Sequence, residues 1–97
     1  MEGSVITLEN ITALVKPLTK KYHVKEMYLF GSYARGEADE NSDLDFLVFG
    51  GEGFKLTSIL ALGGEVLKKK VDIFEIREVN QDSEFYRTIM REKVFVA

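Results

Sequence analysis

The sequence predicts an α/β (α+β) fold: a small mixed three-stranded sheet packed with helices, in the element order α-β-α-β-α-β-α. Two observations predict it. Apolar residues recur at helical spacing in three segments, and three short apolar runs with the length of strands alternate with the helical segments. A further short helix is framed by glycines. Because 97 residues suffice for one hydrophobic core, we expect residues 1–97 to form a single domain.

The helices have recognisable ends. They are expected over about residues 7–22, 32–37 and 55–69, and in a last segment that carries Phe85, Tyr86, Ile89 and Met90. Thr7 is the expected N-cap of the first helix, and Asp82 or Ser83 can cap the last. Pro17 should kink or split the first helix, because proline lacks a backbone N–H. The apolar tail, residues 94–96, fits either a final core strand or an exposed docking surface.

The candidate chemistry constrains how the strands pair. Strands are expected over residues 25–30, 43–49 and 71–76. Gly31 and Ser32 follow the first strand, whereas Asp43 and Asp45 begin the second, so these residues share a site only if the two strands are antiparallel. Asp72 begins the third strand and joins them only if strands two and three are parallel. The intervening helix then provides a right-handed crossover.

Gly31 and Ser32 form a candidate phosphate-binding turn. Gly31 ends an apolar strand, and its missing Cβ allows a sharp turn and a close approach to a ligand. Ser32 opens a helix, where unpaired N–H groups and the helix dipole favour an anion. This turn can therefore cradle a polyphosphate, although Ser32 can also be read as a helix cap alone.

Three aspartates are candidate metal ligands. Asp43 and Asp45 are two residues apart at the start of a strand and so point to the same face. Two carboxylates held this close repel each other unless a divalent cation lies between them, and oxygen ligands suit Mg²⁺ or Mn²⁺. Asp72 lies between two apolar strand residues, where a carboxylate is costly to bury unless it is paired or bound to a metal.

Other polar residues near these motifs allow simpler interpretations. Arg35 either contacts phosphate or pairs with an acid such as Asp39 or Glu40. His23, the single histidine, is expected to face solvent. Residues 68–70 are three lysines, which are most simply the solvated end of a helix.

Composition excludes several classes of protein. The 45% hydrophobic and 30% charged residues are typical of a globular domain, and no apolar run approaches the length of a membrane span. Absence of cysteine excludes disulfides, thiolate catalysis and Cys-based zinc sites and agrees with the cytoplasm. A net charge of −3 argues against stable nucleic-acid binding.

These motifs together resemble a known family. Gly31-Ser32, ten intervening residues and Asp43-Leu44-Asp45 resemble the signature of the DNA polymerase β-like nucleotidyltransferase superfamily. The fuller string from Gly31 through Arg35-Gly36 to Asp45 most resembles the minimal nucleotidyltransferases, the MntA-type antitoxins. Residues 70–73 and 89–94 also fit that family.

The resemblance implies a function and assigns the residues. Asp43, Asp45 and Asp72 would be catalytic ligands of two Mg²⁺ ions, with Asp72 the general base, and Gly31 and Ser32 would bind the triphosphate of ATP, with Arg35 a further candidate for that contact. The implied reaction moves AMP to a hydroxyl, and in the minimal family the acceptor is a tyrosine of a HEPN-type toxin. Two rivals remain: an antitoxin that acts by binding alone, and a transferase for small molecules such as aminoglycosides. Homo-oligomerisation stays open.

Overall fold

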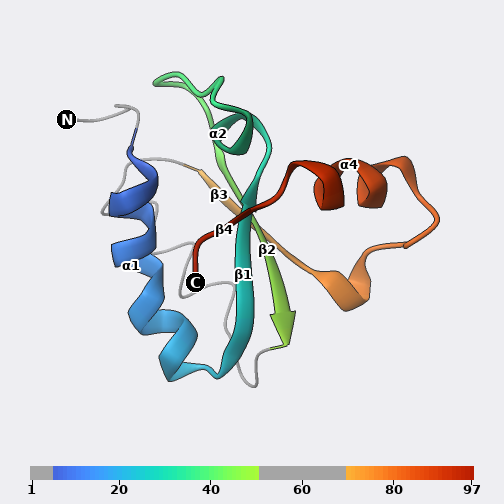
Figure 1. The fold of residues 1–97 in the computed structure, drawn as a ribbon, viewed down its shortest axis with the longest axis horizontal. Coiled ribbons are helices and arrows are strands. Elements are labelled where there is room, and N and C mark those ends of the chain that lie inside the picture. Colours follow the sequence, from blue (N-terminus) through green and yellow to red (C-terminus); the bar gives the residue numbers. More distant parts are fainter. Residues whose placement is uncertain (1–5, 51–69) are drawn as a thin grey trace.

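A mixed four-stranded sheet with strand order β3-β2-β1-β4 forms the centre of the protein (Figure 1). The computed structural model describes residues 6–50 and 70–97. The strands are Val24–Phe30 (β1), Leu44–Gly50 (β2), Val71–Glu75 (β3) and Val94–Phe95 (β4). As predicted, β1 and β2 are antiparallel and β2 and β3 are parallel. The expected number of three strands is wrong, because β4 adds a fourth beside β1.

Helices cover both faces of this sheet. They are Leu8–Lys21 (α1), Ser32–Arg35 (α2) and Glu84–Glu92 (α4), and a 3₁₀ turn, Ile76–Glu78, follows β3. Figure 1 shows α1 on one side of the sheet and α4 on the other. None of the helices in residues 6–50 and 70–97 is long and apolar enough to cross a membrane. The helix expected over residues 55–69, and with it the crossover to β3, lies outside the described residues.

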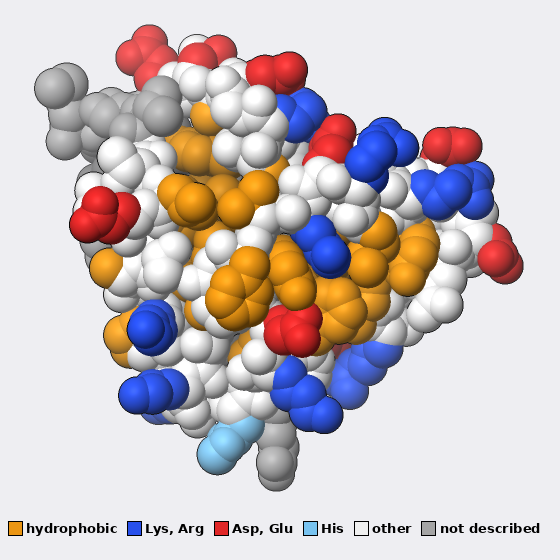
Figure 2. Space-filling view, viewed as in Figure 1, with side chains coloured by type: hydrophobic (Ala, Val, Ile, Leu, Met, Phe, Trp, Pro, Cys, Tyr) orange, Lys and Arg blue, Asp and Glu red, His pale blue; other side chains and the backbone are white. Residues whose placement is uncertain are grey.

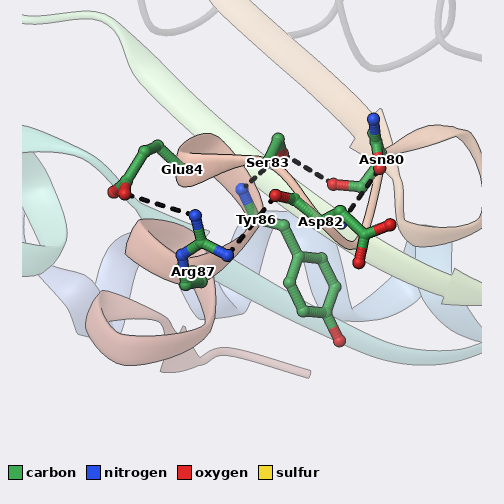
Figure 3. Close-up of polar contacts among 6 residues, drawn as sticks. All are labelled: Asn80, Asp82, Ser83, Glu84, Tyr86 and Arg87. Atoms are coloured by element: carbon green, nitrogen blue, oxygen red, sulfur yellow. Dashed lines mark hydrogen bonds and ion pairs between the residues drawn. The ribbon is translucent and has the colours of Figure 1, made fainter.

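The helix starts follow the predicted capping rules. The Thr7 hydroxyl accepts a hydrogen bond from the backbone N–H of Asn10, which confirms Thr7 as the N-cap of α1. Ser83, and not Asp82, caps α4 in the same way by accepting from the N–H of Tyr86. Figure 3 shows how the preceding turn is closed, with the Ser83 hydroxyl donating to the carbonyl oxygen of Asn80 at 2.6 Å.

Helix α1 passes through Pro17 without ending, so the expected split is wrong. Pro17 lies on the exposed side, while Ile11, Val15 and Thr19 are buried on the opposite side. Burial on both sides of the proline holds the helix together despite one lost hydrogen bond. The shorter α2 ends earlier than expected, because Gly36 adopts the left-handed conformation, with φ 73° and ψ 22°, that commonly terminates a helix.

Alternation along the strands divides the core into two layers. The layer under α1 contains, from the sheet, Met27, Leu29, Leu44, Phe46, Val48 and Val71. The layer under α4 contains Phe30, Leu47 and the buried helix residue Ile89. Successive residues of β1 and β2 thus point to opposite faces, and both faces are covered. A strand buried on both faces has a strongly specified register, which matters for the site below.

The tail belongs to the fold. Val96 is only 3% exposed and lies in the core layer under α1. Its N–H donates to the carbonyl oxygen of Met27 at 2.9 Å, and the Met27 N–H donates to the Ala97 carbonyl oxygen at 2.8 Å. The neighbouring Phe95 is 59% exposed and lies edge-on to the ring of Tyr28, with 5.5 Å between ring centroids. The tail thus adds β4 to the sheet and buries Val96, which favours the core strand, while Phe95 stays exposed and a docking role for it stays a prediction.

Exposed aromatic side chains gather on the face that carries β1, β4 and α4. Figure 2 shows a band of hydrophobic side chains across this face, interrupted by charged groups. Phe85 of α4 is 43% exposed and packs edge-on against Phe30 and Phe74, with centroid distances of 5.9 and 5.3 Å. Helix α4 therefore buries Ile89 fully, while Phe85 one turn earlier remains at the surface.

Burial of Val96 and exposure of Phe95 predict that substitutions at these two positions have different effects on stability. Val96→Ala should lower the free energy of unfolding by roughly 2 kcal/mol, because it removes fully buried methyl groups. Phe95→Ala, which truncates an exposed ring, should lower it by less than about 1 kcal/mol. Urea unfolding of both variants measures the difference. Equal losses, or a larger loss for Phe95→Ala, would contradict the assignment of the tail to the core.

Candidate nucleotidyl-transfer site

The candidate residues gather at the end of the sheet where β1 ends and β2 and β3 begin. Asp45 of β2 pairs with Phe30 of β1 on one side and with Asp72 of β3 on the other. Because Leu44 and Phe46, the neighbours of Asp45, are in the layer under α1, Asp45 points to the α4 side of the sheet. The same alternation places Asp72 on that side. The sheet thus aligns two carboxylates on adjacent strands.

Gly31 lies against the Asp45 carboxylate. Its backbone has φ 78° and ψ −154°, a conformation that is essentially restricted to glycine. A Cβ at this position would lie 2.6 Å from Asp45 Oδ2, so no other residue fits without moving the carboxylate. The turn that follows β1 therefore leaves no room for a side chain between its backbone and the Asp45 carboxylate. The sequence predicted a close approach of this glycine to a ligand, which stays a prediction, and the close neighbour in the structure is the Asp45 carboxylate.

Ser32 is the first residue of α2, and the N-cap is Gly31, which has no side chain to offer. The interpretation of Ser32 as a helix cap alone is therefore wrong, and its half-buried hydroxyl remains beside the turn. Helix α2 has only four residues, so its dipole contributes little to anion binding. Binding of a phosphate here would depend on local N–H groups, the Ser32 hydroxyl and nearby cations.

Asp45 is electrostatically strained. Burial, then the charge of Asp72 and then that of Asp43, raise the pKa of the Asp45 carboxyl from 3.8 to about 6, while Lys70 and Arg35 act in the opposite direction. Asp43 precedes β2 and is exposed. The Asp45 carboxylate thus faces two like charges that the neighbouring cations offset only in part.

A divalent cation fits this donor set. The carboxylates of Asp43, Asp45 and Asp72 are hard oxygen ligands, and the pKa of Asp45 is raised first by burial and then by the charges of Asp72 and Asp43. In residues 6–50 and 70–97, however, no three carboxylate or histidine side chains are grouped closely enough to hold a metal ion as they stand. Mutual repulsion opposes such a grouping, and a bound cation would remove that repulsion.

Two cations lie beside the acids. The Nζ of Lys70 is 3.9 Å from Asp72 Oδ2, which the interpretation of residues 68–70 as a solvated helix end did not anticipate. The pairing could have been inferred from the sequence, because Lys70 lies two residues before Asp72 and such residues share one face of a strand. Arg35 pairs with Glu37 and Glu92, at 2.8 and 3.1 Å, whereas the sequence suggested Asp39 or Glu40.

No local signal identifies Glu92 as a partner, because the two residues are 57 positions apart. The loop after α2 contains a turn in which Asp39 Oδ1 accepts from the backbone N–H of Asn41 at 2.8 Å. His23, which was expected to face solvent, is exposed and has a positive φ of 58° after α1.

The structure thus places a glycine-serine turn opposite acidic residues across antiparallel strands, the arrangement that the resemblance to nucleotidyltransferases implies. The chain matches the family model described as "Nucleotidyltransferase domain" over residues 11–96. It therefore belongs to the nucleotidyltransferase domain family and is a nucleotidyltransferase. The resemblance to the minimal nucleotidyltransferases is confirmed by its relatives.

One similar protein is the protein adenylyltransferase MntA of Thermococcus cleftensis, which is 36% identical over 100 residues that cover 96% of this chain and 99% of the relative. A crystal structure of a toxin-antitoxin assembly with AMP-PNP has a similar fold, with a TM-score of 0.72 and 19% identity over 89% of this chain and 72% of the other. A tri-AMPylated Shewanella oneidensis HEPN toxin in complex with MNT antitoxin also matches, with a TM-score of 0.67 and 14% identity over 94% of this chain and 72% of the other.

Two glycine variants test the close approach at Gly31. Gly36→Ala should cost about 1–2 kcal/mol of stability through its positive φ alone, because no atom lies within 4 Å of the added Cβ. Gly31→Ala should cost more, because it adds a steric conflict with Asp45, and it alone should weaken AMP-PNP binding. Urea unfolding and calorimetric titration measure both effects. Equal behaviour of the two variants would contradict this account.

The raised pKa of Asp45 predicts how stability depends on pH in metal-free protein. The folded-state pKa of about 6 lies above the ordinary 3.8, so the stabilising contribution of protonated Asp45 is fully present below pH 3.8 and is lost as the pH rises through 6. Asp45→Asn should therefore raise the Tm at about pH 7.5 and leave it unchanged near about pH 4.

Thermal melts in a chelating buffer make this comparison. Asp82→Asn, which removes an exposed carboxylate before α4, is the control for net charge. A shift in Tm that is the same at both pH values, or the same in the control, would be inconsistent with the electrostatic strain at Asp45.

Proposed function

We propose that this nucleotidyltransferase moves AMP from ATP to a tyrosine hydroxyl of a HEPN-type toxin in the cytoplasm and thereby acts as its antitoxin. The observation that supports this most is the position of Gly31 against Asp45, with Asp72 on the adjacent strand. It brings a turn suited to phosphate to within contact distance of the acids. The names of the relatives, a protein adenylyltransferase and antitoxins in complex with toxins, favour a protein acceptor.

Asp43, Asp45 and Asp72 would hold Mg²⁺, with two ions expected and Mn²⁺ as an alternative. When bound, the metal would lower the pKa of the acceptor hydroxyl and neutralise negative charge on the triphosphate. The fit rests on the chemistry of the three carboxylates and on Asp45, whose pKa is raised by burial and by the charges of Asp72 and Asp43. AMP-PNP in a structurally similar assembly is consistent with a nucleoside triphosphate as substrate.

The residues of the chain have separate roles in this reaction. The Gly31–Ser32 turn and Arg35 would bind the triphosphate and orient its α-phosphorus. Asp72 would accept the proton of the acceptor hydroxyl as general base. The hydroxyl oxygen then forms a bond to the α-phosphorus, the bond from that phosphorus to the bridging oxygen breaks, and pyrophosphate leaves.

Mass spectrometry of a cognate HEPN protein after incubation with this chain, ATP and Mg²⁺ tests the proposal. We expect the mass to increase by whole AMP units, with the modification on a tyrosine. Asp45→Ala and Asp72→Ala should each abolish the increase, because they remove a metal ligand or the base, and both should still fold. Transfer by either variant at more than about a hundredth of the parent rate would contradict these roles, since loss of a catalytic base alone costs about 10²-fold or more.

The same experiment separates the two rival functions. A toxin that is neutralised in the complex while its mass stays unchanged would indicate an antitoxin that acts by binding alone. Transfer of AMP to an aminoglycoside, with the toxin unmodified, would indicate a small-molecule transferase. The circular dichroism spectrum of each variant establishes that lost transfer does not reflect unfolding.

A further inference from the structure

A long-range ion pair connects the end of α4 to the candidate nucleotide site. Glu92, the last residue of α4, accepts a hydrogen bond from Arg35 Nη1 at 3.1 Å across 57 positions of sequence. The other ion pairs recorded in the described part of the chain join residues that are two or three positions apart. The contact between Arg35 and Glu92 is therefore the electrostatic connection between the turn after β1 and the C-terminal helix.

Two carboxylates fix the Arg35 guanidinium. Glu37 Oε1 accepts from Nε at 2.8 Å, and Glu92 Oε1 accepts from Nη1. The side chain of Glu37 is 64% exposed and that of Glu92 is 20% exposed, so water screens the contact with Glu92 less than the contact with Glu37. A guanidinium has five N–H donors, and two of them serve these contacts. The remaining three, including both on Nη2, can still donate to another anion.

Arg35 follows the Gly31–Ser32 turn directly, and its charge acts on the Asp45 carboxyl. The backbone N–H of Arg35 donates to the carbonyl oxygen of Gly31 at 3.1 Å, which places Arg35 one turn beyond the glycine. Its positive charge also acts on the Asp45 carboxyl, where it opposes the rise in pKa that Asp72 and Asp43 cause. An anion bound at the turn would lie in the field of the same guanidinium.

We propose that Glu92 is a positioning residue that holds Arg35 with its free N–H donors available to the triphosphate of the substrate. This inference rests on the proposed function, because it requires a nucleotide at the Gly31–Ser32 turn. An exposed arginine samples many rotamers, and its ordering opposes binding. Glu92 and Glu37 order the side chain before the nucleotide arrives, so a smaller part of the binding energy is lost.

A double-mutant cycle on AMP-PNP affinity tests the proposal. Calorimetric titration with Mg²⁺ compares the parent chain, Arg35→Gln, Glu92→Ala and the double variant. We expect Kd to rise about tenfold or more for Arg35→Gln, because charged hydrogen bonds to phosphate are lost. For Glu92→Ala we expect a rise of about threefold to fivefold. In the Arg35→Gln background, Glu92→Ala should have no further effect, since it acts only through Arg35.

Glu84→Ala is the matched control. Glu84 is also on α4 and pairs with an arginine, Arg87, at 3.2 Å, but at the opposite end of the helix (Figure 3). It should leave Kd unchanged. Glu92→Gln keeps one acceptor oxygen and should have a smaller effect than Glu92→Ala. It replaces Glu92→Ala in the cycle if that variant does not fold.

Two kinds of result would overturn the inference, and they differ in whether the proposed function also fails. If Glu92→Ala and Glu84→Ala bind AMP-PNP as the parent does, or if the effects of Glu92→Ala and Arg35→Gln are additive, Glu92 has a structural role only, while the proposed function stands. If the parent chain itself fails to bind AMP-PNP, the proposed function fails, and the inference fails with it.

Discussion

The register between β1 and β2 is the constraint on which the site depends. It sets Phe30 opposite Asp45, so that the glycine after β1 meets the carboxylate. A slip by one residue would turn Asp45 into the apolar layer under α1 and bring Phe46 or Leu44 to the site. Apolar contacts on both faces of the sheet oppose that slip. The irregularity in the pairing lies between Val24 and Glu26, at the far end of β1.

The fold holds Asp45 and Asp72 side by side on neighbouring strands, where their negative charges repel each other. Parallel pairing of β2 and β3 aligns Asp45 with Asp72, and this repulsion is tolerated because the apolar layers on both faces fix the strands. Lys70 and Arg35 supply positive charge nearby, but each is also committed to a carboxylate, Asp72 or the glutamates. Stability is thus lowered locally at the place where a cationic ligand would restore it.

The features that local sequence determines could be predicted. A hydroxyl before a helical segment identified Thr7 as a cap, and a glycine after an apolar strand identified the turn at Gly31. The directions of the strands could be predicted because the candidate site residues lie on three strands and can meet only if β1 and β2 are antiparallel and β2 and β3 are parallel. The paired aspartates could be placed on one face because strand side chains alternate.

The features that depend on distant contacts could not be predicted. The sequence left open whether the tail forms a strand, because β4 has two residues, too few to show a period, and its partner β1 lies more than sixty positions earlier. The pairing of Arg35 with Glu92 has no local signal for the same reason. Of the two expectations for Pro17, a kink or a split, the split does not occur, because burial of Ile11 and Thr19 holds α1 together on both sides of the proline.

The position of β4 along β1 has a consequence for the exposed edge of the sheet. A strand at the edge of a sheet exposes unpaired N–H and C=O groups that can recruit another chain. The tail covers this edge of β1 at Tyr28 and Leu29, and Met27 bonds to the residues that follow β4. Lys25 and Glu26, which continue β1 beyond the tail, are exposed and charged, a composition that discourages strand addition. A chain that lost the tail would expose an apolar sheet edge, so it would tend to aggregate as well as to unfold.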